Sequence, residues 1–239
     1  MSTETEIHSN LDRVHERIAR AAKRAGRSAD EITVVAVSKT FPAEAIRAAY
    51  TAGVRHFGEN RVQEWESKYR ALADLDATWH LIGHLQSNKV RRAAYLFRRI
   101  DSVDNLGLAK KLDAAAAAEG KNLPVLIEVH LGGETTKSGV GQSDLPALAE
   151  SVAPFAHLDL VGLMTIPPFA VDPQQARLYF RKLRELRDNV SRRLGRKLPV
   201  LSMGMSHDFE IAIEEGATEI RIGTAIFGER ARQPVSAEE

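Results

Sequence analysis

The chain alternates between short apolar runs and longer stretches in which apolar residues recur every three or four positions. The short runs are rich in Val, Ile and Leu and have the length of buried strands. Eight strands are predicted, at residues 32–38, 54–58, 78–83, 98–103, 124–130, 158–166, 199–204 and 218–223. Helical stretches separate them at residues 43–53, 61–72, 88–97, 105–120, 145–153, 173–195 and 207–216. In the sixth of these, charged residues are expected to face solvent, and the side that meets the sheet is expected to carry Tyr179, Phe180, Leu183 and Leu186.

A further helix is predicted ahead of the first strand, over about residues 9–25. Ser9 or Asn10 is placed to cap it, its apolar stripe starts at Leu11, and Gly26 is expected to end it. Other glycines suited to the left-handed position after a helix follow later stretches, at Gly53, Gly120, Gly195 and Gly216.

Strands that alternate with helices form a parallel sheet, and eight of them without a Pro/Gly/Ser-rich linker predict an α/β fold. The expected fold is a single (β/α)₈ TIM barrel with an extra N-terminal helix. Residues 1–239 are expected to form one domain, with the barrel over about 32–230 and a short C-terminal tail. A doubly wound sheet is the rival topology. The first strand-to-helix turn, SKTFPAE, has no glycine and therefore lacks a dinucleotide-binding fingerprint.

Composition narrows the classes of function. The 33 Lys and Arg residues nearly balance 32 Asp and Glu residues, which argues against binding nucleic acid or a membrane surface. The absence of cysteine excludes disulfides, thiolate metal sites and a cysteine nucleophile. The N-terminus does not read as a secretory signal, and no apolar stretch approaches the roughly 20 residues that span a bilayer. A cytoplasmic protein is expected.

The run ITVVAVSKT, residues 32–40, ends a strand on the amine of Lys39. In a barrel of this kind the active site lies at the carboxyl ends of the strands. Period-2 alternation places Lys39 on the same face as Val35 and Val37, so the amine can point along the barrel interior. Partial desolvation would lower the pKa of the amine and make it a Schiff-base nucleophile. A solvated surface lysine is the alternative.

Small residues follow the seventh and eighth strands in SMGMSHD (202–208) and RIGTAIFG (221–228). Gly204, Ser206, Gly223 and Thr224 allow backbone N–H groups and hydroxyls to approach an anion. A phosphate site in these two loops recurs in (β/α)₈ barrels. The alternative is that these residues only make turns and that Ser206 only caps the helical stretch 207–216.

Four further polar residues have more than one interpretation. Arg221, inside the eighth strand, needs an acceptor, which is either Glu219 or a ligand. Asn60, after the second strand, either binds a ligand oxygen or caps the next helix. His80 and His84 could suggest a metal, but no third ligand has matching spacing and no HExxH motif occurs. We therefore expect the two histidines to line the barrel mouth.

In a closed barrel the first strand lies beside the eighth. An amine at the end of the first strand would then face an anion-binding loop, which suits a phosphorylated aldehyde. Seven segments resemble, in this order, the pyridoxal phosphate homeostasis protein family: AVSKTFP, HFGENRVQE, WHLIGHLQSNK, TTKSGV, GLMTIPP, SMGMSHDFEIAI and EIRIGTAIFGER. The resemblance spans roughly residues 7–230 and extends to the barrel domain of alanine racemases.

The resemblance implies that pyridoxal 5′-phosphate (PLP) is the cofactor and that Lys39 holds it as an aldimine. It implies phosphate contacts from Met205, Ser206, Gly223 and Thr224, with Arg221 facing the pyridine nitrogen and Asn60 and His84 near the cofactor. Lys137 matches a family lysine after the fifth strand, whereas His130 stands where the family usually has Asn.

The function implied by the resemblance is PLP homeostasis, through buffering and delivery of the cofactor, without a dedicated reaction. Apo PLP-dependent enzymes are the implied partners. The residues after Gly228 are too few for the second, β-rich domain of alanine racemases, so a monomer is expected. Two enzymatic alternatives stay open: an amino-acid racemase, for which no tyrosine is evidently placed as second base, and a Schiff-base aldolase acting on a sugar phosphate.

Overall fold

Eight parallel strands form a closed barrel in the computed structural model of the chain, which describes residues 3–132 and 138–229. Each strand pairs with its neighbours in sequence, and β1 pairs with β8 to close the sheet. The strands are β1 Thr33–Val37, β2 His56–Glu59, β3 Thr78–Leu81, β4 Arg99–Val103, β5 Leu123–Glu128, β6 Leu158–Met164, β7 Val200–Met205 and β8 Glu219–Ile222. All eight predicted runs form strands, and the closed barrel excludes the doubly wound alternative.

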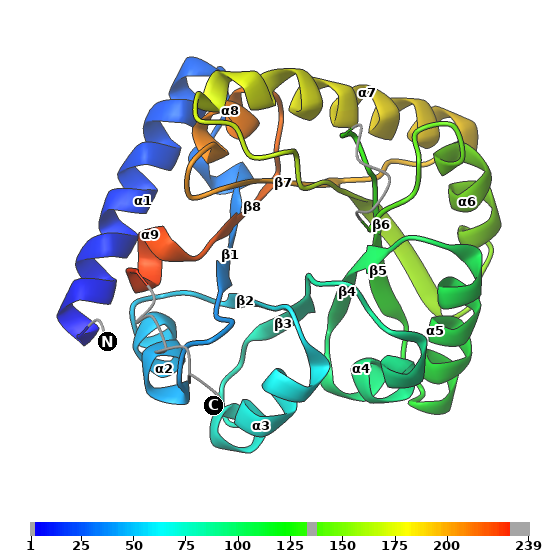
Figure 1. Ribbon diagram of the computed structural model, residues 1–239, viewed down its shortest axis with the longest axis horizontal. Coiled ribbons are helices and arrows are strands. Elements are labelled where there is room, and N and C mark those ends of the chain that lie inside the picture. Colours follow the sequence, from blue (N-terminus) through cyan, green and yellow to red (C-terminus); the bar gives the residue numbers. More distant parts are fainter. Residues whose placement is uncertain (1–2, 133–137, 230–239) are drawn as a thin grey trace, which may run out of the picture.

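Helices surround the barrel as an outer ring (Figure 1). They are α1 Glu4–Arg24, α2 Ala43–Thr51, α3 Val62–Leu72, α4 Val90–Leu96, α5 Leu106–Ala118, α6 Leu145–Val152, α7 Arg177–Leu194, α8 Phe209–Glu214 and α9 Thr224–Phe227. Short 3₁₀ turns are η1 Ala29–Glu31, η2 Ser87–Lys89 and η3 Pro173–Ala176. The sequence did not predict α9, because four residues are too few to show helical periodicity.

The first helix begins earlier than predicted. Thr3, not Ser9 or Asn10, is its N-cap: the Thr3 hydroxyl accepts from the N–H of Glu6, whose carboxylate accepts from the N–H of Thr3. This reciprocal capping box satisfies two backbone donors and therefore outcompetes a later start. Asn10 lies inside the helix and donates to the carbonyl oxygen of Ile226 in α9, at 2.9 Å.

Helix α1 covers the side of the barrel that carries the two short helices α8 and α9. It packs against α8, α9 and α2, as Figure 1 shows, and buries an apolar face that runs from Ile7 to Ala22. Its end agrees with the prediction, since Gly26 has a φ of +66°. The φ values of Gly53, Gly120, Gly195 and Gly216 are also positive, as expected for glycines that follow helices.

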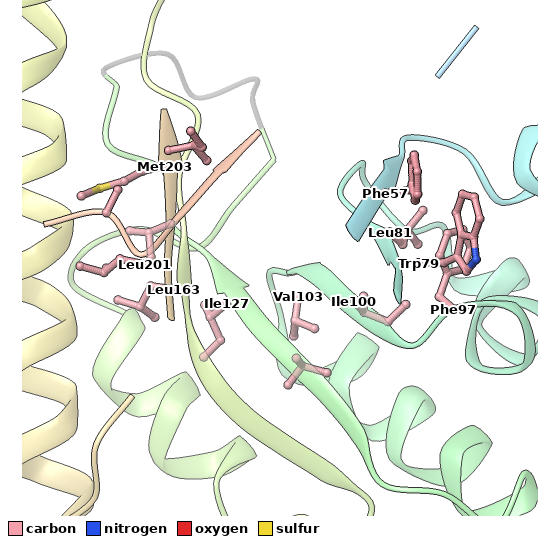
Figure 2. Close-up of a cluster of buried hydrophobic side chains, with 14 of the residues drawn as sticks. Phe57, Trp79, Leu81, Phe97, Ile100, Val103, Ile127, Leu163, Leu201 and Met203 are labelled. Carbon is pink, nitrogen blue, oxygen red and sulfur yellow. The ribbon is translucent and has the colours of Figure 1, made fainter. Parts of the chain in front are cut away.

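Aromatic rings anchor α3 to the outer face of β2 and β3. The ring of Trp65 stacks on Trp79 with centroids 3.7 Å apart, and Trp79 stacks on Phe57 at 5.0 Å. Figure 2 shows Phe57, Trp79 and Phe97 grouped on one side of the apolar cluster. The indole N–H of Trp65 donates to the carbonyl oxygen of Leu96 at 3.2 Å. These contacts fix where the polar side chains of α3 reach the barrel mouth.

Helix α7 packs as its sequence pattern predicts. Phe180 and Leu183 are buried, and Tyr179 and Leu186 are partly buried against the same core. Its arginine-rich face forms ion pairs with α8; for example, Arg177 contacts Glu214 at 2.6 Å.

Candidate functional site

Two connections meet at the carboxyl end of the barrel, the one after β1 that carries Lys39 and the one after β8. A Cβ added at Gly223 would lie 3.6 Å from the Cβ and the carbonyl oxygen of Val37. The rings of Phe41 and Phe227 stack with centroids 4.7 Å apart. Lys39 itself is half-buried. The structure thus brings the amine-bearing segment and the loop after β8 to one edge, as the closed barrel predicted.

Side chains of α3 hold the residues on either side of Lys39. The N–H of Thr40 donates to Glu64 Oε1, and Thr40 has a φ of +68°, a left-handed conformation that costs a non-glycine residue about 1–2 kcal/mol. Lys68 Nζ donates to the carbonyl oxygen of Ser38 at 3.2 Å and to Glu64 Oε1 at 2.8 Å. The backbone before and after the lysine is therefore clamped.

A buried carboxyl completes this clamp. Glu59, at the end of β2, accepts from the Ser38 hydroxyl at 2.7 Å and from Lys68 Nζ at 3.2 Å, both through Oε1. Its other oxygen is buried and has no hydrogen-bond partner among the described residues. Burial raises the pKa of Glu59, although the Lys68 charge and the Ser38 hydroxyl oppose the shift. Burial also acts to raise the pKa of Glu64, but the hydrogen bonds from Lys68 and Thr40 outweigh it and the pKa is lowered.

The loop after β7 differs from the prediction at Ser206. The hydroxyl does not cap α8, for which no side-chain cap is formed; instead its oxygen accepts from the N–H of Ala225 in α9, at 3.3 Å. Asp208 Oδ1 accepts from the N–H of Met205 at 2.6 Å. Gly204, with a φ of +94°, allows close approach, because a Cβ there would lie 2.6 Å from the Cβ of Ala212. The loops after β7 and β8 are thus hydrogen-bonded to each other.

Arg221 is buried in β8, and among the described residues its guanidinium donates hydrogen bonds to neutral groups. Its Nη1 donates to Ser202 Oγ and its Nη2 to the carbonyl oxygen of Thr165, both at 2.8 Å. Glu219 is not its hydrogen-bond acceptor, because that carboxylate pairs with Arg99. Burial lowers the pKa of Arg221, and the longer-range charge of Glu219 opposes the shift. The guanidinium retains donors for an acceptor in the barrel.

Asn60 and His84 lie together at the ends of β2 and β3. Both line a cavity of about 650 Å³. A Cβ added at Gly83 would lie 2.3 Å from the carbonyl oxygen of Asn60, so the two connections touch. Asn60 is not the N-cap of α3; that position is Arg61, which forms no side-chain cap. His84 Nδ1 is 3.5 Å from Asp104 Oδ2.

His80 does not line the mouth, contrary to the prediction. It lies toward the amino-terminal end of the barrel, where its Nε2 is 3.0 Å from His56 Nδ1 and its Nδ1 is 3.5 Å from Asp101. Ligand atoms of His80, Asp101 and Glu219 lie within 4.8 Å of one another. The Arg99 guanidinium already contacts both carboxylates, at 2.6 Å for Asp101 and 2.5 Å for Glu219. A protein cation thus already occupies the position between the two carboxylates that a metal ion would take.

The structure assigns no function to two residues that the sequence analysis named, Lys137 and His130. Lys137 lies outside the described residues. The Nε2 of His130 is buried without a hydrogen-bond partner among the described residues.

Sequence reasoning also missed Ser202 and Thr165, which hold Arg221, and the pairing of Glu59 with Lys68. The sequence indicated one related contact: the four-residue spacing of Glu64 and Lys68 along a predicted helix is typical of an ion pair.

The chain matches known families over nearly its whole length. The family model for the N-terminal domain of alanine racemase matches residues 9–231. The chain is 50% identical over 220 residues to the pyridoxal phosphate homeostasis protein of Aquifex aeolicus, covering 92% of this chain and 96% of that protein. It is 44% identical over 233 residues to the pyridoxal phosphate homeostasis protein of Escherichia coli K12, covering 94% of this chain and 97% of that protein.

Solved structures show the same barrel. PipY of Synechococcus elongatus, solved with PLP bound, is 40% identical with a TM-score of 0.80, covering 88% of this chain and 100% of that chain. Alanine racemase of Clostridium difficile is 15% identical with a TM-score of 0.70, covering 95% of this chain and 57% of that chain, a likeness that shows the fold alone. Within residues 3–132 and 138–229, no helix has the length and apolarity to cross a membrane.

Proposed function

Because the chain belongs to the family of pyridoxal phosphate homeostasis proteins, we propose that it binds PLP through the amine of Lys39 and serves in PLP homeostasis. The observation that carries this proposal is the packing of the β1 connection against the β8 connection, through Val37 with Gly223 and Phe41 with Phe227. An amine and an anion-binding loop at one edge suit a ligand with an aldehyde at one end and a phosphate at the other.

The residues present fit this cofactor. We propose that Met205, Ser206, Gly223 and Thr224 hold the phosphate, and that Asn60 and His84 lie near the cofactor on the other side of Lys39. Arg221 is a buried cation whose hydrogen bonds go to neutral groups, so it fits a ring nitrogen with a free lone pair. The cofactor supplies an electron sink for amino-acid chemistry when its ring nitrogen is protonated. A guanidinium beside that nitrogen disfavours its protonation, which supports a protein that holds the cofactor rather than one with a dedicated reaction.

The test of cofactor binding is spectroscopic. Purified protein should show the absorption band of lysine-bound PLP, and borohydride followed by peptide mapping should mark the peptide that contains Lys39. Lys39→Ala should lose the band, while Lys110→Ala, on the exposed surface of α5, should keep it. An unchanged band in Lys39→Ala, or a label on another lysine, would refute the assignment.

Homeostasis without a dedicated reaction requires its own test. L-alanine incubated with the PLP-loaded protein in deuterium oxide should show no rapid α-deuteration. Rapid deuteration with turnover would instead establish a racemase. PLP transfer to an apo-enzyme, followed by recovery of that enzyme's activity, tests the proposed delivery.

We further propose that residues 1–239 form a single domain, that the protein is a monomer and that it acts in the cytoplasm. Closure of the barrel by the chain's own eight strands supports one cooperative unit. Light scattering should give the mass of one chain, 26.4 kDa, and urea should unfold the protein in one transition. Cell fractionation tests the location.

A further inference from the structure

A cavity beside the end of β2 gathers polar side chains that the proposed cofactor site leaves largely unused. Its volume is about 650 Å³, and it lies between the start of α3 and the connection from β3 to η2. None of its lining residues is acidic. The polar residues that line it are Asn60, Arg61, Gln63, His84, Gln86 and Lys89.

The positive charges in this cavity are not matched by protein carboxylates. Among the described residues, Arg61 and Lys89 form no ion pair and no side-chain hydrogen bond. Glu64 influences Arg61 only at longer range, because its carboxylate is engaged by Lys68 and Thr40. Side-chain cations without a partner leave donors available for an anion.

Neutral hydrogen-bond donors and the dipole of helix α3 also favour an anion in this cavity. The side-chain amides of Asn60, Gln63 and Gln86 form no hydrogen bond among the described residues. Helix α3 starts at the cavity wall, and its N-cap residue supplies no side-chain cap. The positive end of an 11-residue helix therefore adds to the charges of the cavity.

The cavity lies beyond the end of β2, the strand that pairs with β1. Val37 of β1 lies opposite Gly58 of β2, and Lys39 and Asn60 each follow two residues after this pair. The connection after β8 lies on the other side of β1, since β1 lies between β8 and β2 in the barrel. An anion in the cavity and a phosphate at the loops after β7 and β8 would therefore lie on either side of the connection that carries Lys39.

We propose that this cavity is a binding site for a small organic anion, held through a compact oxyanion group by Arg61 and Lys89. A guanidinium fork matches the two oxygens of a carboxylate or a phosphate, and the ammonium adds a point charge. The shared chemistry is the oxyanion, and the experiment separates carboxylate from phosphate. The proposal extends the proposed function, since it places a second ligand at the end of β2, the neighbour of the strand that leads to Lys39, but anion binding itself does not require bound PLP.

The test is titration of the ¹⁵N-labelled full-length protein, with PLP bound, by succinate, by inorganic phosphate and by neutral succinamide. We expect succinate or phosphate to shift the amide signals of Gly83 and Gln86, and succinamide to leave them unmoved. Arg61→Gln and Lys89→Gln should each weaken binding at least tenfold, whereas Lys110→Gln should not. Arg61 is exposed and Lys89 half-exposed, so both variants should fold.

Each outcome decides a separate point. Binding of either anion at these amides supports the site, and the tighter of the two identifies the group. Equal affinities for the parent protein and for both glutamine variants, or shifts confined to the β7 and β8 loops, would overturn it. The same titration of Lys39→Ala separates this proposal from the proposed function: retained succinate or phosphate binding supports the anion site even if PLP binding fails.

Discussion

Lys68 of α3 lies 3.2 Å from Glu59 of β2, and one ammonium thereby links a surface helix to a buried carboxyl. The same ammonium reaches the carbonyl oxygen of Ser38, next to Lys39. Glu59 has no exposed surface, so its charge depends on this partner. The position of the candidate reactive lysine is thus coupled to the docking of α3, which Trp65 anchors through its stack on Trp79.

Lys68→Met should destabilise the protein by about 2 kcal/mol, the range for a lost hydrogen bond to a charged group. The methionine keeps the aliphatic stem but leaves Glu59 and the Ser38 carbonyl without this donor. Urea unfolding measures the change as a lower midpoint. Lys110→Met on α5 is the matched control and should change stability by less than about 0.5 kcal/mol. Equal midpoints for the two variants would contradict the clamp.

The loss of folding stability in Lys68→Met should depend on pH. Burial already raises the pKa of Glu59, and loss of the Lys68 charge should raise it further. A carboxyl whose pKa is higher in the folded state favours folding at low pH, and that stability is lost as the pH rises through the folded-state pKa. The gap to the parent protein should therefore be wider at pH 8 than at pH 5. A gap that narrows with rising pH would exclude Glu59 as its source.

Arg99→Met should cost about 3–5 kcal/mol, because it leaves Asp101 and Glu219 buried without their cation. Burial acts to raise the pKa of Asp101, but in the parent protein the Arg99 charge outweighs it and the pKa is strongly lowered. Asp101 therefore stabilises the parent above its unfolded pKa, and this stability is lost as the pH falls.

In Arg99→Met these carboxyls should have the opposite effect on the pH dependence of stability. Without the guanidinium, burial should raise the pKa of both carboxyls, so the variant gains from protonation as the pH falls. The stability difference should shrink between pH 7 and pH 4, as followed by thermal unfolding. Lys110→Met, at an exposed position of α5, serves as the control. A difference independent of pH would mean that Arg99 acts through packing alone.

Gly204→Ala should destabilise the fold by about 3 kcal/mol and weaken PLP retention. The new Cβ would lie 2.6 Å from the Cβ of Ala212 and 2.9 Å from the Cα of Phe209, which is buried. Gly120→Ala is the control for backbone strain alone: its φ is also positive, at +62°, but nothing lies within 4 Å of the added Cβ. It should cost about 1 kcal/mol. Equal costs would show that close packing at Gly204 is unimportant.

Thr3→Ala should cost about 1 kcal/mol by removing the capping box of α1. Ser9→Ala should be neutral or slightly stabilising, because Ser9 lies inside the helix and alanine is the better helix former. Chemical denaturation of the two variants compares them directly. A larger loss of stability in Ser9→Ala than in Thr3→Ala would instead support a start of α1 at Ser9, as the sequence pattern predicted.

Local pattern in the sequence predicted the eight strands and most of the helices in their order, although not α9. Its apolar runs and helical periodicities identified eight strands and the helix ahead of them, since burial on both faces of a parallel sheet requires such runs. It also placed Lys39, Arg221 and the small residues of the last two loops at or near strand ends, because strand ends can be read from local pattern. The proximity of the loop after β8 to the end of β1, seen between Gly223 and Val37, followed from barrel closure.

The pairing of side chains became visible in the three-dimensional structure and not in the sequence. Arg221 bonds Ser202 and Thr165 rather than Glu219, and His80 lies at the opposite end of the barrel from His84. Such choices depend on strand register and on distances between residues far apart in sequence, which periodicity does not encode. The cavity at the end of β2 has the same origin: Asn60 and Lys89 belong to different connections, and the barrel fold brings them to one wall.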